Sequence, residues 1–237
     1  MYFSEGSESK SIPNYEYVIA QSRSEFTEQS LSRLAQILLK NKENDKAIPV
    51  LSRLENEADV SQNKTYAQSN LMKLYYNKKD YPNSGIYAEK VLMNPKADDN
   101  VKSDAQIIIA RAAIETGDEA KAKVAYAKVL AIAKGELAAE ALYYDAYFKN
   151  KEGKFEASNA AVQKIAKNYS SYKYFGAKGL ILMAKNFYGL KDSYQATYIL
   201  ENVIQNFTDY PDVVSEAKTE LNAIKTEEAK TNSSITK

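Results

Sequence analysis

Apolar residues recur along the chain at spacings of three and four residues, for example at Leu31, Leu34 and Leu38. This spacing places them on one face of an α-helix, whereas no stretch alternates with a period of two for long enough to form a strand. The pattern therefore predicts an all-α fold. The expected helices span residues 12–22, 25–40, 45–58, 62–77, 82–93, 100–116, 119–133, 136–151, 155–169, 174–189, 193–207 and about 211–228.

Small residues recur with a nearly constant period of 36 to 38 residues. The second-helix row consists of Ser11, Ala47, Ser84, Ala122, Ser158 and Ala196. The first-helix row lies twelve residues before the last five of these, at Ala35, Met72, Ala110, Ala146 and Ala184. Antiparallel helices joined by a short turn approach closely only where one presents a small side chain. Each pair leaves an apolar face that the next pair must cover, so the pairs are expected to stack.

The turn and helix around Ala122 carry a resemblance to a known family. Gly117-Asp118 is followed by Ala122 and, four residues later, by Tyr126. This order is similar to the tetratricopeptide repeat (TPR) family, although the period exceeds that family's usual 34 residues. The resemblance implies a right-handed α-solenoid of antiparallel helix pairs with a C-terminal capping helix. The stretch from Tyr174 to Asn206 resembles the last repeats of long, divergent arrays of the Gram-negative cell envelope.

The two rows and the resemblance predict the layout of the chain. Because a Lys-x-Ile-Pro sequence begins at Lys10 and again at Lys46, we expect the chain to begin within an array, as the C-terminal part of a longer protein. We also expect one elongated domain rather than two globules. The predicted segments are an incomplete repeat with only a second helix (1–24), five helix pairs (25–60, 61–97, 98–134, 135–172 and 173–209), a capping helix (210–229) and a disordered tail (230–237).

Composition narrows the classes of function. The 237 residues include 32 Lys plus Arg and 31 Asp plus Glu, so charge gives no argument for nucleic acid or an anionic membrane as the main partner. The absence of His and Cys removes the commonest general base, the thiol nucleophile and most transition-metal ligands. We therefore expect no enzyme, no catalytic residue, no cofactor and no metal site. No apolar run approaches the roughly 18 residues of a membrane span, so we expect no membrane insertion.

The TPR resemblance implies a concave groove lined by the first helices. One residue after each member of the first-helix row come Gln36, Lys73, Arg111, Tyr147 and Lys185. This column favours an extended acidic peptide, a C-terminal carboxylate or an anionic glycan, although Lys and Arg are also common on a solvated helix face. The candidate partner-binding residues are Lys73, Tyr76, Asn77, Arg111, Tyr143, Tyr147, Lys185 and Tyr188.

Two groups of these candidates leave alternatives open. Lys73 and Asn77 lie one turn apart, as in the TPR clamp for peptide carboxylates, but later in the helix than that clamp places them. The four candidate tyrosines lie on the predicted groove side and either pack or contact a ligand. In contrast, the tyrosines expected to pack inside the repeats are Tyr75, Tyr126 and Tyr144.

The favoured function is a non-catalytic scaffold whose groove binds an extended or acidic segment of another protein in an envelope-associated complex. Two alternatives remain, a glycan- or cell-wall-binding module and a structural spacer that assembles through its solenoid ends. The resemblance implies the periplasm or the inner face of the outer membrane, while composition allows the cytoplasm equally. We expect this chain by itself to be monomeric.

Overall fold

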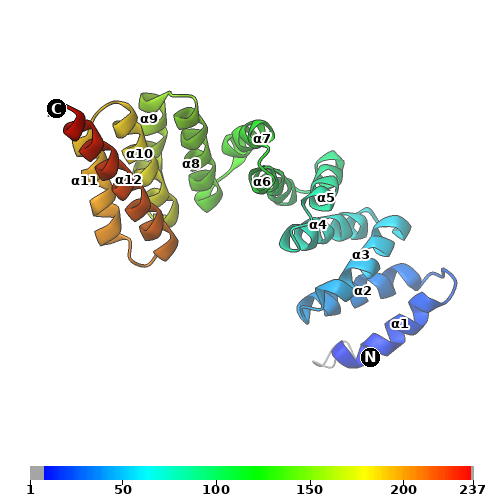
Figure 1. Ribbon diagram of the computed structural model, residues 1–237. Coiled ribbons are helices and arrows are strands. Elements are labelled where there is room, and N and C mark those ends of the chain that lie inside the picture. The colour runs from blue at the N-terminus through cyan, green and yellow to red at the C-terminus, as the bar shows by residue number, and fades with distance from the viewer. Residues whose placement is uncertain (1–7, 236–237) are drawn as a thin grey trace. The chain divides into compact units, whose positions relative to one another are not determined.

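The computed structural model describes residues 8–235, and these residues contain helices but no strand (Figure 1). The predicted all-α class is therefore confirmed. A short 3-10 helix, Glu8–Ser11, precedes α1 (Ile12–Ala20), α2 (Thr27–Lys40), α3 (Asn44–Glu57), α4 (Ser61–Asn77), α5 (Tyr81–Met93), α6 (Asp99–Glu115), α7 (Glu119–Ile132), α8 (Gly135–Lys151), α9 (Phe155–Asn168), α10 (Lys173–Gly189), α11 (Ser193–Asn206) and α12 (Pro211–Ile235).

The contacts divide the chain into two compact units, unit 1 (1–122) and unit 2 (123–237), with the boundary inside α7. We expected one elongated domain, and each of the two units has core residues of its own. In unit 1 the core includes Leu31, Leu51 and Leu71, and in unit 2 it includes Ile181 and Leu200. Since α7 is rich in alanine, it buries less apolar area per residue than a helix of larger side chains, which fits a boundary at this place.

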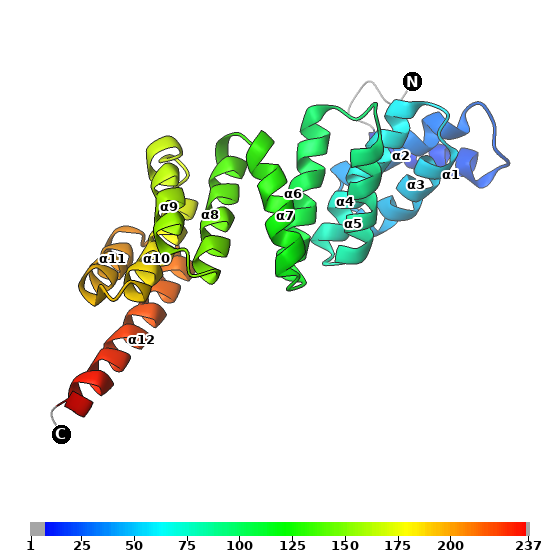
Figure 2. The same ribbon diagram turned by 90° about the horizontal axis from the view of Figure 1, so that it is seen from above.

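Helix pairs stack within each unit as an all-α solenoid. In unit 1, α2 packs on α3 and α4 on α5, and each pair also contacts the next one through α3 with α4 and α5 with α6. In unit 2, α8 packs on α9 and α10 on α11, while α9 also contacts α10 (Figure 2). The last helix, α12, packs on both α10 and α11, so it covers the final pair as predicted.

Both rows lie in the buried interior of the helix pairs. The members of the first-helix row and of the second-helix row are all buried, with at most 5% of any side chain exposed. Twice the two rows are joined directly, because Ser84 Oγ donates to the Met72 carbonyl (3.0 Å) and Ser158 Oγ donates to the Ala146 carbonyl (2.8 Å). The predicted close packing of first and second helices is therefore confirmed.

The turn of each helix pair uses one backbone design. Its central residue has a left-handed conformation, and the next residue's N–H bonds to the carbonyl five residues earlier, as Asp80 N does to Tyr75 O (2.9 Å). This is a Schellman motif, which favours glycine at the left-handed position. The left-handed residues of these five turns are Lys42, Lys79, Gly117, Gly153 and Lys191.

The C-terminal helix is longer than the sequence indicated. We expected the helix to end near residue 228 and the chain to be disordered from 230, but α12 continues to Ile235. The physical reason is that no glycine or proline follows Glu228, so nothing in the chain terminates the helix. Residues 236–237 of the predicted tail and residues 1–7 of the incomplete repeat lie outside the described part of the chain.

Candidate functional site

Four of the candidate residues meet in one hollow of unit 1. Lys73, Tyr76 and Asn77 of α4 and Arg111 of α6 line a cavity of about 320 Å³, the α4–α6 pocket. The three α4 residues share one helix face because they are spaced by three and four residues. The facing residues of α6 are Asp104, Ile107, Ile108 and Arg111, which also follow helical spacing.

The α4–α6 pocket contains two cations and one carboxylate. Lys73 Nζ lies 2.6 Å from Asp104 Oδ2, and the two side chains are 50% and 42% exposed. An ion pair as open to water as this one contributes about 0.2–1 kcal/mol, so a competing carboxylate can displace Asp104 at modest cost. The lining therefore includes two cations, Lys73 and Arg111, and one carboxylate, Asp104.

Apolar and aromatic side chains form the rest of the α4–α6 pocket. Ile107 and Ile108 are buried, so they present an apolar wall beside the charged groups. The ring of Tyr76 packs edge-on against Tyr81, with their centroids 5.7 Å apart. The pocket therefore combines cation, amide and phenol groups with an apolar wall, which suits a short peptide segment better than a bare ion.

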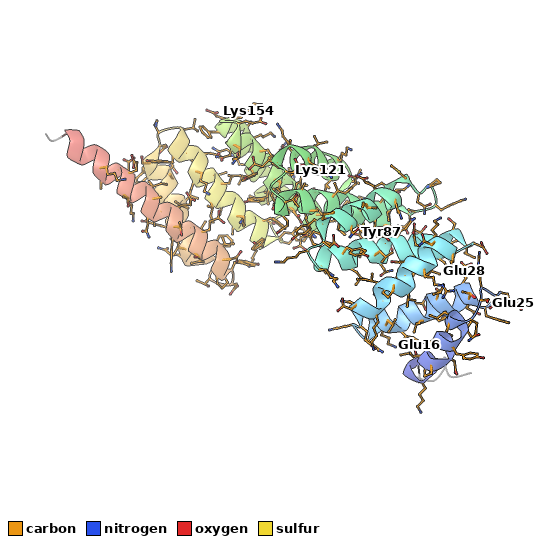
Figure 3. All side chains as sticks on the ribbon, turned by 45° about the vertical axis from the view of Figure 1, so that its right-hand side comes forward. Glu16, Glu25, Glu28, Tyr87, Lys121 and Lys154 are labelled. Carbon is orange, nitrogen blue, oxygen red and sulfur yellow. The ribbon has the colours of Figure 1, made fainter. Side chains whose placement is uncertain are left out.

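A second hollow of unit 1, the α2–α4 pocket, has a volume of about 430 Å³ and includes Gln36. Its main polar feature is Glu28, labelled with Glu25 at the same end of unit 1 in Figure 3. The Glu28 carboxylate accepts hydrogen bonds from the N–H groups of Asp59 (3.0 Å) and Val60 (3.1 Å) and from Asn63 Nδ2 (2.8 Å). It therefore holds the residues at the start of α4 from another helix pair.

The pKa of Glu28 reflects this position. Partial burial alone raises the pKa of a carboxyl group, but the hydrogen bonds from Asn63, Asp59 and Val60 outweigh burial and hold the pKa of Glu28 below its ordinary value. Sequence analysis missed this contact, because the bonded groups lie 31 to 35 residues away from Glu28 along the chain.

In unit 2, the predicted basic column meets acidic residues of α12. Lys185 Nζ lies 2.9 Å from Glu220 Oε1 and 3.6 Å from Glu216 Oε1. Lys178 Nζ lies 3.0 Å from Glu216 Oε2; burial alone lowers the pKa of Lys178, but the contact with Glu216 outweighs it and raises the pKa above the ordinary value. Lys185 is thus paired within unit 2, which the column of equivalent positions did not predict.

The three candidate tyrosines of unit 2 pack against neighbouring side chains. The ring of Tyr143 lies 5.1 Å from that of Tyr144, and Lys178 Nζ lies 5.6 Å from its centroid. Burial, followed by the charge of Glu216, raises the pKa of Tyr143 above its usual range. Tyr147 contacts Phe148 edge-on at 5.3 Å. Tyr188 is partly buried against the core formed by α10, α11 and α12.

The tyrosines expected to pack do so. Tyr126 is 1% exposed and stacks on Tyr144, with centroids 4.1 Å apart and planes 20° apart. Tyr75 stacks on Tyr87 at 5.6 Å. The Tyr126 hydroxyl also donates to Glu140 Oε1 (2.8 Å), a buried carboxylate that the sequence pattern did not single out.

Within residues 8–235, no three Asp or Glu side chains gather closely enough to hold a metal ion. Among the same residues, no helix combines the length and the apolar character that crossing a membrane requires.

Comparison of the chain with models of known protein families gives no match. A comparison with curated proteins gives none either.

Proposed function

We propose that this chain is a non-catalytic scaffold of the TPR type, and that its α4–α6 pocket binds an extended acidic segment of a partner protein. The observation that supports this proposal is the convergence of Lys73, Tyr76, Asn77 and Arg111 in one hollow between first helices. The TPR resemblance places a ligand groove along these helices. By the same resemblance, we place the protein in the cell envelope, on its periplasmic side.

The chemistry of the α4–α6 pocket suits a carboxylate on a peptide. Lys73 and Arg111 supply charge-assisted donors, and the Asn77 amide can pair with the backbone of an extended segment. Ile107 and Ile108 contact the aliphatic part of the ligand. In the free protein, Asp104 forms an ion pair with Lys73. Asp104 therefore competes with the carboxylate of the ligand for this cation.

Because Asp104 competes with the ligand, the proposal predicts one variant that weakens peptide binding and one that strengthens it. A fluorescently labelled peptide containing four glutamates is titrated with the chain, and affinity is followed by anisotropy. The double variant K73E/R111E is expected to lose at least tenfold in affinity, whereas D104N, which frees Lys73, is expected to gain severalfold. The matched control K96E/K102E changes the same net charge of unit 1 at two positions outside the pocket.

The outcome is decided by comparing these variants. If K73E/R111E and K96E/K102E weaken binding equally, only the general charge of unit 1 matters and the pocket is not the site. If the pocket variants alone lose binding, a pull-down from an envelope extract with wild type and K73E/R111E identifies the natural partner.

One observation favours glycan binding as a second candidate. Tyr194 and Tyr198 of α11 are 75% and 55% exposed, and their rings lie 6.5 Å apart with planes 13° apart. Exposed, nearly parallel rings can stack on sugar faces. Quenching of tyrosine fluorescence by envelope oligosaccharides, and its loss in Y194A/Y198A, tests this candidate. No response to any of the oligosaccharides would exclude it.

A further inference from the structure

Unit 2 contains a hollow of a different kind, among α9, α10 and α11. This cavity, the α9–α11 pocket, has a volume of about 420 Å³, within the range of small-molecule sites. Its floor is one face of α10, and its walls come from α9 and from the end of α11. The apolar lining residues that matter here are Val162, Ile165, Gly176, Leu180, Met183 and Phe207.

Two glycines of α10 show how the α9–α11 pocket is built. A Cβ added at Gly179 would lie 3.1 Å from Val162 Cγ1 and 3.6 Å from Ile165 Cδ1, so this glycine lets α10 approach α9 closely. A Cβ added at Gly176 would meet no atom within 4 Å. Helix packing therefore does not require glycine at 176, although glycine weakens a helix. The missing side chain leaves the floor of the pocket open.

The lining of the α9–α11 pocket also includes an exposed cation, Lys173. Lys173 is the first residue of α10 and lies on the same face as Gly176 and Leu180, spaced by three and seven residues. Among the residues that the structure describes, Lys173 has no ion pair or hydrogen bond, whereas Lys178 and Lys185 of the same helix pair with α12. The positive end of the α10 dipole adds to its charge.

We propose that the α9–α11 pocket binds a small amphipathic carboxylate, such as a medium-chain fatty acid, with its apolar chain in the cavity and its carboxylate on Lys173. A carboxylate gives Lys173 the partner that it lacks, and an apolar chain matches the lining. An extended peptide fits less well, because its backbone N–H and C=O groups would face mainly apolar walls without partners.

Titration calorimetry with monomeric sodium decanoate tests the ligand class. Decanoate is expected to bind the whole chain more tightly than 1-decanol or decyltrimethylammonium, which have the same chain length. From octanoate to decanoate, affinity is expected to rise about fourfold for each added CH₂. The absence of decanoate binding, or equal binding of the cationic probe, would overturn the proposal. Binding to phosphatidylglycerol vesicles without binding of monomeric decanoate would overturn it as well.

Variants of α10 test whether decanoate binds in the α9–α11 pocket. G176L fills the open floor and is expected to weaken decanoate binding at least tenfold. The matched control is G85L in α5 of unit 1, where an added Cβ also meets no atom within 4 Å and the helix gains the same propensity. K173Q keeps the cavity and is expected to reduce decanoate affinity to that of 1-decanol. Equal affinity of G176L and G85L, or no effect of K173Q, would contradict the assignment.

Discussion

Units 1 and 2 are built from the same kind of helix pair, yet they form their hollows on different helices. In unit 1 the two pockets lie between successive first helices, α2 with α4 and α4 with α6, and charged and amide groups line them. In unit 2 the α9–α11 pocket lies over α10, between the second helices α9 and α11, and its lining is mainly apolar. The repeat fixes how backbones pack, but it leaves the chemistry of each exposed face free to differ.

The last helix explains part of the difference between the units. Glu216 and Glu220 lie one turn apart on α12 and pair with Lys185, while Glu216 also pairs with Lys178. In unit 1, the carboxylate that pairs with Lys73 comes from the next first helix, α6, and the pair is largely open to water. Equivalent positions in a repeat therefore do not have equivalent accessibility.

The strongest test of the division into units uses one core position in each. Leu51 and Leu200 each lie four residues after a member of the second-helix row, and both are fully buried. Truncation to alanine costs about 2–5 kcal/mol in a packed core. We expect L51A to accelerate native-state hydrogen exchange in unit 1 and L200A in unit 2, because repeat contacts are mostly between neighbours. Equal acceleration of exchange in both units by either variant would show a single cooperative body.

A smaller effect is expected where unit 2 departs from unit 1 inside the core. Asn186 is fully buried, and its amide donates to Ser158 Oγ (2.9 Å) and Asn159 Oδ1 (2.7 Å) and accepts from Asn150 Nδ2 (2.7 Å). The equivalent residue three repeats earlier is the buried Leu74.

We expect N186A to lower the free energy of unfolding by about 1–3 kcal/mol, since it removes three bonds and leaves polar groups without partners. Chemical denaturation measures the change. The control N159A removes only one of the three bonds at a partly buried side chain, so it is expected to cost less. Equal effects of the two variants would mean that the Asn186 amide is not the centre of the network.

The helix pairs were predictable from the sequence because close helix packing favours small residues at the contact, and such residues recur at a regular period at Ala47, Ser84 and most of their equivalents. The α4–α6 pocket was predictable in part for the same reason. Lys73 and Arg111 hold equivalent positions in neighbouring repeats, so stacking brings them to one hollow. Helical periodicity is a local property of the sequence. The predictions of the helix pairs and of the α4–α6 pocket both depend mainly on this periodicity.

The remaining features depend on contacts between segments that are distant in the sequence, or on the side chain that a glycine lacks. Nothing in the spacing of Lys185 shows that Glu220, on another helix, will neutralise it. The hydrogen bonds of Glu28 likewise join separate helix pairs. The α9–α11 pocket depends on a side chain that Gly176 does not have, and a pattern of apolar residues records only the side chains that are present. The helix α12 extends to Ile235, beyond the predicted end near residue 228, because no glycine or proline follows Glu228 to terminate it.

The turns offer a test in which glycine should be the more stable residue at the left-handed position in both units. Lys79 in unit 1 has φ 60° and Gly153 in unit 2 has φ 71°, at the same position of the Schellman motif. We expect K79G to stabilise the protein by about 0.5–1 kcal/mol, since relief of the left-handed strain exceeds the entropy that glycine adds to the unfolded chain. G153A should destabilise it by a similar amount. Thermal unfolding measures both variants, and a destabilising K79G would show that Lys79 makes contacts worth more than its strain.

The smallest expected effect concerns pH and applies to unit 1. The pKa of Glu28 is held below its ordinary value of 4.5 by the hydrogen bonds to the start of α4. A lowered pKa in the folded state adds stability above the unfolded pKa, and this stability is lost as pH falls through the folded value. We therefore expect E28Q to be less stable than wild type at pH 7, and the difference to shrink as the pH falls below about 4.5.

Hydrogen exchange of the α4 backbone amides, measured from pH 7 downward, reports this effect where it arises. E25Q is the matched control, because Glu25 lines the same α2–α4 pocket and makes no hydrogen bond among the residues described. Its exchange should follow that of wild type at every pH. If the E28Q and wild-type curves stay parallel, the Glu28 carboxylate does not stabilise the start of α4 through its charge. Unit 2 should show no difference between the variants, because the hydrogen bonds of Glu28 lie within unit 1.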